Sequence, residues 1–410
     1  MRILVSGASI AGPVLAYWLT RFGHEVTVVE RAPELRKTGG GHAVDVFGPA
    51  MEICERMGAV PAITERSTGT TRLTVHREGA RRPATIDLAK LFGAVTDRHI
   101  EIMRDDLSEI FADLTRADVE YVFGDSITSI ADDGAVEFDS GAPRRFDLVI
   151  GADGLHSTVR NLVFGPESMF STFLGAYLGV VSVPDSLRRD GEYIEHLGVG
   201  RTAGVYSARH LDDARAVFLF RSRDRLDYHY RDVPRQKQLL RGAFTGMHPE
   251  VDGWLSELDR TPAFYFDSIT QLRMARWSRG RVTLVGDAGF CPGPAVGGST
   301  SLAIVGAYVL AGELAVADGD HERAFAAYER VMTPLVLGSR SFARDTAKKQ
   351  LPTTRFGTWM LVRSLQMISA LPAGLGRYLA QRNTKGLRLY DSLPLGDYAT
   401  PGTPRPDGRA

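Results

Sequence analysis

The first thirty residues combine two apolar runs with one stretch of amphipathic spacing. Residues 2–6 (RILVS) are mostly β-branched or aliphatic and stop at Gly7, which is typical of a short buried strand. Residues 10–22 carry apolar side chains at spacings of three and four, so they predict a helix that Gly23 ends. Residues 25–30 (EVTVVE) predict a second strand. We therefore expect a right-handed βαβ unit and a parallel sheet.

Apolar runs much further along the chain predict more strands of the same sheet. Residues 146–150 and 281–285 predict buried strands. Residues 177–220 alternate between apolar and polar positions, most clearly at 217–220 (VFLF), which predicts a second sheet. A sheet assembled from separate stretches implies an inserted domain. We expect an α/β fold with one domain from residues 1–70, 101–170 and 276–330, a mixed β-sheet domain from 71–100 and 171–275, C-terminal helices over 331–399 and a flexible tail at 400–410.

The most apolar stretch, residues 296–317, is long enough to cross a membrane. It opens with glycines and contains Ser299, Thr300, Ser301 and Glu313. These polar side chains favour a helix buried inside the protein over a membrane span. We therefore expect no membrane partner.

The charge balance and the cysteine count argue against some classes of protein. The 410 residues include 49 Lys and Arg against 49 Asp and Glu, and this zero balance argues against broad nucleic-acid binding. The two cysteines, Cys54 and Cys291, suit a reducing compartment, and the first residues lack the pattern of a signal peptide. The ten histidines show no short metal-binding spacing. We expect a cytoplasmic protein, a monomer or weak homodimer, with no metal site and no nucleic-acid partner.

The loop after the first predicted strand has the spacing of a dinucleotide fingerprint. Residues 7–12 (GASIAG) fit G-x-S-x-x-G, in which Gly7 permits a tight turn and Gly12 lets the helix pack on the strand. The start of the helix offers N–H groups to a pyrophosphate. An acid lies about 20 residues further on, at the end of the second strand, where it can accept from ribose hydroxyls. A carboxylate there disfavours the 2′-phosphate of NADP, so the site suits FAD or NAD better. The candidate residues are Gly7, Ser9, Ile10, Ala11, Gly12, Glu30 and Arg31.

Two further motifs follow in the sequence. Residues 147–160 (DLVIGADGLHSTVR) place an Asp-Gly turn between a buried strand and a helix, although Asp153 and Ser157 could simply cap that helix. Residues 285–298 (VGDAGFCPGPAVGG) place a Gly-Asp pair and a Gly/Pro loop before the long apolar helix. In this order, the three motifs resemble those of the class A flavoprotein monooxygenases, the para-hydroxybenzoate hydroxylase family. The resemblance covers about residues 1–330 and implies a Rossmann-like FAD-binding domain of the glutathione-reductase type.

The resemblance also implies cofactor contacts. The Asp-Gly motif would support both FAD and NAD(P)H, and Asp287 would bind the ribityl chain. Arg36 resembles a basic residue of the family, but a surface arginine fits it equally well. Phe290 stands where the family usually has His, and the GGSTS and Gly306-Ala307 stretches also depart from its pattern. The expected cofactor residues from this source are Arg36, Arg104, Asp153, Gly154, Gly286, Asp287, Pro294, Gly297, Gly298, Ser299 and Thr300.

The implied activity is hydroxylation of a small aromatic or polyketide-like molecule with NAD(P)H and oxygen through a flavin hydroperoxide, in antibiotic or secondary-metabolite biosynthesis or modification. Residues 198–204 (GVGRTAG) predict a hairpin turn and not a second fingerprint, so NAD(P)H would bind only transiently. A dehydrogenase or reductase of the same fold, or a ligand-sequestering flavoprotein, remains as an alternative. No general base can be named. Candidate substrate contacts, each equally explained as sheet core, are Tyr206, Phe218, Phe220 and His196.

Overall fold

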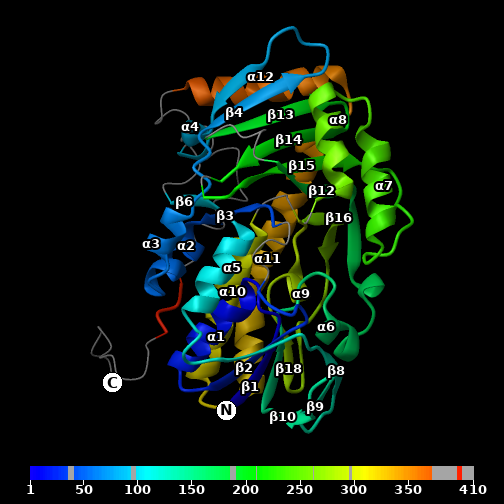
Figure 1. Cartoon of the computed structure of the whole chain (residues 1–410). Helices are drawn as coiled ribbons and strands as arrows, with labels where there is room; N and C mark the ends of the chain where they lie inside the picture. Colours follow the sequence, from blue (N-terminus) through cyan, green and yellow to red (C-terminus); the bar gives the residue numbers. More distant parts are fainter. Residues whose placement is uncertain are drawn as a thin grey trace.

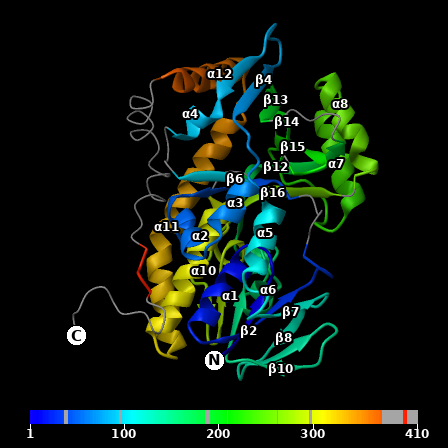
Figure 2. The same cartoon turned by 60° about the vertical axis from the view of Figure 1, so that its left-hand side comes forward.

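The computed structural model describes residues 1–35, 41–93, 98–184, 191–208, 210–261, 263–294, 298–371 and 395–398. Two sheets lie at opposite ends of the molecule, and a long helix runs from one part to the other (Figures 1 and 2). The predicted α/β fold class, with a parallel-sheet domain and an inserted mixed sheet, is confirmed.

The first sheet has six strands in the order β17-β18-β11-β1-β2-β7, and only the β17–β18 pairing is antiparallel. Its neighbouring central strands come from widely separated parts of the chain, as the apolar runs predicted. A small antiparallel sheet, β10-β9-β8, lies beside it. The bounds are β1 (Arg2–Ser6), β2 (Glu25–Glu30), β7 (Glu120–Phe123), β8 (Ile127–Ile130), β9 (Ala135–Phe138), β10 (Arg144–Arg145), β11 (Leu148–Gly151), β17 (Ser278–Arg279) and β18 (Val282–Leu284).

Helices of the first domain pack on one another and on the parallel sheet in a single apolar core. The apolar stretch that could cross a membrane by its length is helix α10 (Ser299–Val316), which lies within the apolar run at residues 296–317. It is apolar all round because it is buried all round, against α1 on one side and α11 on the other. The remaining helices of this domain are α1 (Ala11–Arg21), α2 (Gly48–Arg56), α3 (Val60–Glu65), α5 (Arg104–Asp113), α6 (Thr158–Val163) and α9 (Asp287–Phe290), with the short 3₁₀ helix η1 (Glu167–Met169).

The second sheet has seven strands in the order β16-β12-β15-β14-β13-β4-β5. All of its pairings are antiparallel except that of β13 with β4. Residues 198–201 form the turn of the β13–β14 hairpin, so the expectation of a hairpin here is confirmed. The bounds are β4 (Arg72–Arg77), β5 (Ala84–Asp87), β12 (Ser171–Pro184), β13 (Glu192–Gly198), β14 (Arg201–Ser207), β15 (Asp213–Arg221) and β16 (Phe264–Leu272).

Both faces of this second sheet are covered. One face packs on two helices of the inserted region, and the other packs on the long helix, with a further helix at the β4–β5 end (Figures 1 and 2). A two-stranded ribbon joins the two parts of the molecule. The bounds are α4 (Leu88–Gly93), α7 (Val233–Phe244), α8 (Pro249–Ser256), η3 (Glu257–Asp259), α11 (His321–Gln350) and α12 (Arg355–Ala370), and the ribbon is β3 (Ala43–Phe47) with β6 (His99–Met103).

The C-terminal region is helical as far as Ala370. The described part of the helices predicted over residues 331–399 consists of α11, which already begins at His321, and α12. Residues 372–394 and the predicted tail at 400–410 lie outside the described residues.

Candidate functional site

A cavity of about 390 Å³ lies where the three sequence motifs meet. It is bordered by the loops that follow β1, β11 and β18, so it lies at the carboxyl edge of the parallel sheet, where ligands bind in folds of this kind. The predicted cofactor residues that line it are Gly7, Ser9, Ile10, Ala11, Glu30, Arg31, Arg104, Asp153, Gly154, Asp287, Pro294, Ser299 and Thr300. Gly12, Gly286 and Gly298 lie in the same loops without lining the cavity, while Arg36 and Gly297 lie outside the described residues.

The fingerprint loop requires glycine for steric reasons. Gly7 has a φ of +108°, and a Cβ there would lie 2.5 Å from the carbonyl oxygen of Ala152. A Cβ on Gly12 would lie 1.9 Å from the carbonyl oxygen of Gly7. The loop is therefore packed directly between the start of α1 and the Asp-Gly loop, which leaves its outer side open to the cavity.

Glu30 ends β2 with its carboxylate held by the main chain. Its Oε2 accepts from the N–H of Ala8 at 3.0 Å, and its Oε1 accepts from the N–H of Ala32 at 2.9 Å. Each carboxylate oxygen has two acceptor positions, so both retain capacity for a further donor. N–H groups of the loop and of the strand end therefore hold the Glu30 carboxylate in place for the ribose contact that the sequence predicts. Ser108 donates to Ser9 at 3.2 Å and joins α5 to the same loop.

The Asp-Gly motif caps a helix and lines the cavity at the same time. Asp153 accepts from the Ser157 hydroxyl at 2.5 Å and from the N–H groups of Thr158 and Val159 at 2.8 and 3.1 Å. Ser157 in turn accepts from the N–H of Arg160 at 2.9 Å. Burial raises the pKa of Asp153, although these hydrogen bonds oppose the shift. The capping role and the cavity-lining role therefore coexist in one turn.

The Gly-Asp motif joins β18 to the long apolar helix. Gly286 has a φ of +65°, and Asp287 begins α9. The Ser299 hydroxyl, in the first turn of α10, donates to Asp287 Oδ1 at 2.5 Å. Burial raises the pKa of Asp287, and hydrogen bonding and the charge of Arg104 oppose this. The motif thus places a carboxylate and a helix N-terminus side by side on the cavity wall.

Arg104 faces the cavity with an unused donor. Its Nε is buried and has no hydrogen-bond partner among the described residues. Its guanidinium lies 3.7 Å from Asp105. An unpaired buried N–H costs free energy unless a ligand accepts from it. The cavity is bordered by glycine-containing loops, a helix N-terminus, the carboxylate at the end of β2 and this free donor. These features together fit a flavin adenine dinucleotide.

Several residues on the cavity wall were not found from the sequence. His42, at the start of the β3 ribbon, has its ring centre 6.1 Å from that of Tyr265, which comes from β16. Burial, together with the charge of Arg104, lowers the pKa of His42 to about 4, so the imidazole is neutral at neutral pH. Burial raises the pKa of the Tyr265 hydroxyl well above its usual range. The sequence offered no signal for this pair because the inserted sheet brings Tyr265 to the cavity.

His156 stands between two carboxylates at the cavity edge. Its Nε2 lies 3.0 Å from Asp267 and its Nδ1 lies 2.9 Å from Glu167. Burial disfavours the charged ring, but the hydrogen bonds and charges of both acids outweigh burial and raise the pKa of His156 to about 10. Tyr230 stacks on the ring with centres 4.5 Å apart. This histidine is the fifth residue of the ADGLHS string, so the motif contained its signal.

The four candidate substrate residues lie outside the cavity wall, which corrects the sequence-based expectation. Phe218 and Phe220 on β15, and His196 on β13, pack beneath α7 and α8 on the sheet face away from the cavity. Tyr206 lies on the opposite face, where its hydroxyl accepts from the N–H of Ala43 at 2.5 Å and its ring packs on Met103. None of the four lines the cavity.

Comparisons with known proteins indicate the same cofactor. The family described as FAD binding domain matches residues 1–330. An uncharacterized protein of Mycobacterium tuberculosis is 46% identical over 336 residues, which cover 80% of this chain and 88% of that protein. A flavin-dependent monooxygenase of Legionella longbeachae is 38% identical over 395 residues, which cover 92% of this chain and 97% of that protein.

Two solved structures resemble this chain over nearly its whole length. The crystal structure of tetracycline destructase Tet(51) has a TM-score of 0.82 and 32% identity, and the match covers 97% of this chain and 99% of that one. HpxO of Klebsiella pneumoniae, crystallised with FAD and uric acid, has the same fold with a TM-score of 0.73, 23% identity and coverage of 97% and 98%.

Proposed function

The chain belongs to the FAD binding domain family and is an FAD-dependent monooxygenase, and we propose that it hydroxylates a small aromatic or polyketide-like molecule with NAD(P)H and oxygen. The observation that carries the proposal is the meeting of three motif loops and the unpartnered Arg104 donor in one cavity. The likeness to a tetracycline destructase at 32% identity supports a polycyclic, oxygen-rich substrate. We place the reaction in the biosynthesis or modification of antibiotics or related secondary metabolites.

The cofactor contacts follow from the geometry of the cavity. The fingerprint loop and the α1 N-terminus would bind the pyrophosphate, and Glu30 would accept from the adenosine ribose. Asp287 would accept from the ribityl chain, while the α10 N-terminus would face the pyrimidine ring. When bound, the flavin supplies the transfer of reducing equivalents from NAD(P)H to oxygen.

The residues of this chain position the reactants and exclude water. His42 and Tyr265 form an uncharged wall, since burial keeps the imidazole deprotonated and the phenol protonated at neutral pH. Such a wall limits the entry of water to the reacting groups. A monooxygenase needs this protection because water promotes the release of hydrogen peroxide without hydroxylation of the substrate. His156 stays protonated because its two ring nitrogens are paired with the carboxylates of Glu167 and Asp267 at the cavity edge.

A second cavity of about 530 Å³ supports a docking place for NAD(P)H. It shares His156 and Tyr230 with the first cavity and is also lined by Arg225 and Arg231. Arginine side chains suit the phosphates of a pyridine nucleotide, and an aromatic ring suits its bases. We propose that the nucleotide visits this cavity and leaves, since the described chain shows a single dinucleotide fingerprint.

One assay tests the proposed function. A ligand-shift screen with tetracyclines, other polyketides and simple phenols would first identify a bound compound. That compound should then stimulate NAD(P)H oxidation with matching oxygen uptake and yield a product heavier by one oxygen atom. NAD(P)H oxidation without oxygen uptake would identify a dehydrogenase or reductase, and binding without turnover would identify a sequestering protein. Either outcome would overturn the proposal.

A further inference from the structure

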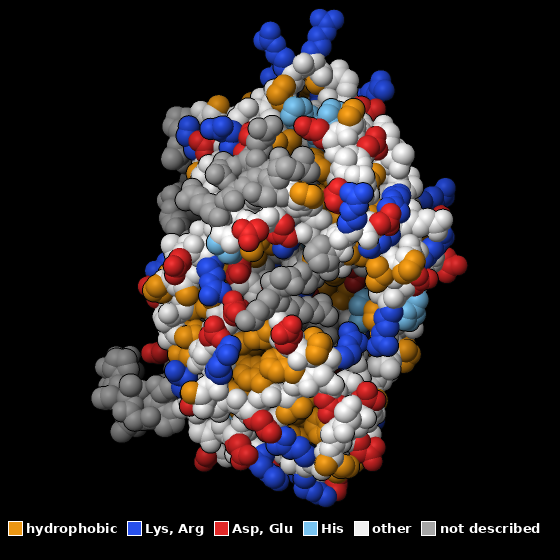
Figure 3. All heavy atoms as spheres, viewed as in Figure 1, with side chains coloured by type: hydrophobic (Ala, Val, Ile, Leu, Met, Phe, Trp, Pro, Cys, Tyr) orange, Lys and Arg blue, Asp and Glu red, His pale blue; other side chains and the backbone are white. Residues whose placement is uncertain are grey.

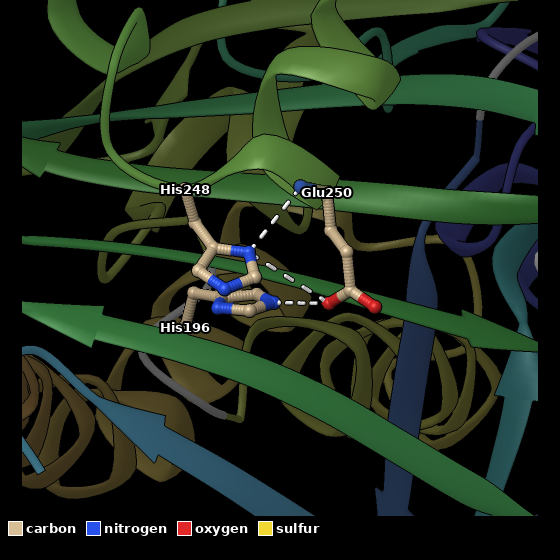
Figure 4. A group of neighbouring side chains, drawn as sticks. All are labelled: His196, His248 and Glu250. Carbon is tan, nitrogen blue, oxygen red and sulfur yellow. Dashed lines mark hydrogen bonds and ion pairs between the residues drawn. The ribbon is translucent and has the colours of Figure 1, made fainter. Parts of the chain in front are cut away.

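Two histidines and a glutamate meet on the far side of the inserted sheet. His196 lies on β13, His248 is the N-cap of α8, and Glu250 is in the first turn of that helix. His196 Nε2 lies 2.7 Å from Glu250 Oε2, and His248 Nδ1 lies 3.9 Å from the same oxygen. Figure 4 shows the three side chains pointing toward one another across the gap between strand and helix. One ligand atom from each residue can be chosen so that all three lie within 4.8 Å of one another.

The three side chains differ in how firmly they are held. His196 is only 3% exposed, and its ring stacks on that of His248 with centres 4.0 Å apart; the rings of His76 and Trp254 lie further off, with centres 5.0 and 5.6 Å away. The side chains of His248 and Glu250 are 42% and 50% exposed. The cluster therefore has one fixed imidazole and two side chains that can turn toward a shared ion.

The Glu250 carboxylate has histidines as its ion-pair partners. Its ion pairs are with His196 and His248, and among the described residues no lysine or arginine pairs with it. Two imidazoles and one carboxylate therefore offer ligand atoms to the same point. This donor set is one that Zn²⁺ accepts in proteins, with water in the fourth position, and imidazole favours Zn²⁺, Cu²⁺ and Ni²⁺ over Mg²⁺ or Ca²⁺.

We propose that His196, His248 and Glu250 bind a divalent transition-metal ion, with Zn²⁺ as the best match. The ion would lie between His196 Nε2 and Glu250 Oε2, which now share a hydrogen bond. A neutral His196 ring would bind through Nε2 with its single proton on Nδ1, and a doubly protonated ring would release one proton to solvent. His248 currently accepts from the N–H of Glu250 at 3.2 Å, and water replaces this bond where the ring turns. No redox step is involved.

The site would act as a clamp between α8 and the sheet. It joins β13 to the first turn of α8, which together with α7 covers the apolar face formed by β12, β14 and β15. It lies on the sheet face opposite to the one on which Tyr206 packs, so it plays no part in the flavin chemistry. No short metal-binding spacing marks this site in the sequence, because the two histidines lie 52 positions apart and meet only through the fold.

Equilibrium dialysis of the FAD-loaded protein against micromolar Zn²⁺ at neutral pH, followed by metal analysis, tests the proposal. We expect one zinc ion per chain, a higher melting temperature with zinc than with a chelator, and no effect of Mg²⁺. His248→Ala and Glu250→Gln change exposed side chains, so they should fold while losing most of the bound zinc and the thermal shift. His196→Ala should do the same where it folds.

The matched control is His321→Ala, an intermediate-exposure histidine at the start of α11, which should bind zinc like the parent protein. Absence of stoichiometric zinc in the parent protein would overturn the proposal. Stoichiometric binding that survives both His248→Ala and Glu250→Gln would also overturn it, because the ion would then lie elsewhere. Replacing zinc with Co²⁺ adds a spectroscopic check, since its visible bands report tetrahedral nitrogen and oxygen ligands and should vanish in the same variants.

Discussion

Gly12→Ala should separate the geometry of the fingerprint loop from the overall stability of the fold. The added Cβ would lie 1.9 Å from the carbonyl oxygen of Gly7 and 3.5 Å from Val5 Cγ1, so the start of α1 must move by about 1 Å relative to β1. Overpacking of this kind costs about 1–3 kcal/mol of unfolding free energy. The same movement displaces N–H groups that would bind the charged pyrophosphate, each worth about 1.5–3 kcal/mol. We expect FAD to bind roughly tenfold to hundredfold more weakly.

Titration of apoprotein with FAD, followed by flavin fluorescence, measures this loss, and thermal unfolding of the same samples measures stability. Gly242→Ala is the matched control, because Gly242 lies exposed in α7 and a Cβ there meets nothing within 4 Å. That variant should keep its FAD affinity and gain about 0.5–1 kcal/mol of stability from its better helix propensity. If Gly12→Ala binds FAD as tightly as the parent protein, the loop does not approach the cofactor as described.

Three further changes test individual side chains. Asp287→Ala should purify largely without flavin colour, since it loses the carboxylate beside the α10 N-terminus, and full flavin occupancy by absorbance would contradict the ribityl role. Glu30→Ala should weaken FAD by about 1–3 kcal/mol in a binding titration, whereas an unchanged dissociation constant would remove its ribose role. The pKa of His156 is raised from 6.5 to about 10 by Asp267 and Glu167 against the effect of burial, so its charge stabilises the fold fully below pH 6.5 and this stabilisation is lost as pH rises through 10. The difference in unfolding free energy between the parent protein and His156→Gln, measured by urea denaturation, should shrink over that range, and a constant difference would refute the pairing.

The cofactor loops could be predicted from the sequence because their chemistry is local. Gly7 has a φ of +108° in the turn after β1, a Cβ on Gly12 would meet the carbonyl oxygen of Gly7 five positions earlier, and Glu30 follows at the end of the next strand. Helix α10 was predicted from the apolar run at residues 296–317 because a long run of apolar residues has few ways to be buried. Neither inference needs knowledge of the rest of the fold.

The substrate side could not be predicted in this way because both faces of the inserted sheet are covered. Alternation along β15 shows that Phe218 and Phe220 share one face, but it does not show which helix covers that face. Likewise, Tyr265 and Asp267 reach the cavity only through the pairing of β16 with β12. Contacts that depend on which helices pack on which face have no signature in a single sequence.

The order of strands in the parallel sheet also constrains how the protein is made. Strand β1 leaves the ribosome first, yet one of its two neighbours is β11, and β11 in turn pairs with β18 near residue 284. The cavity wall is complete only when Ala303 has emerged, after 303 of the 410 residues. Unpaired strand edges on a nascent chain can pair wrongly until the later strands arrive. The parallel sheet therefore folds late, and the cofactor can bind only after most of the chain has been translated.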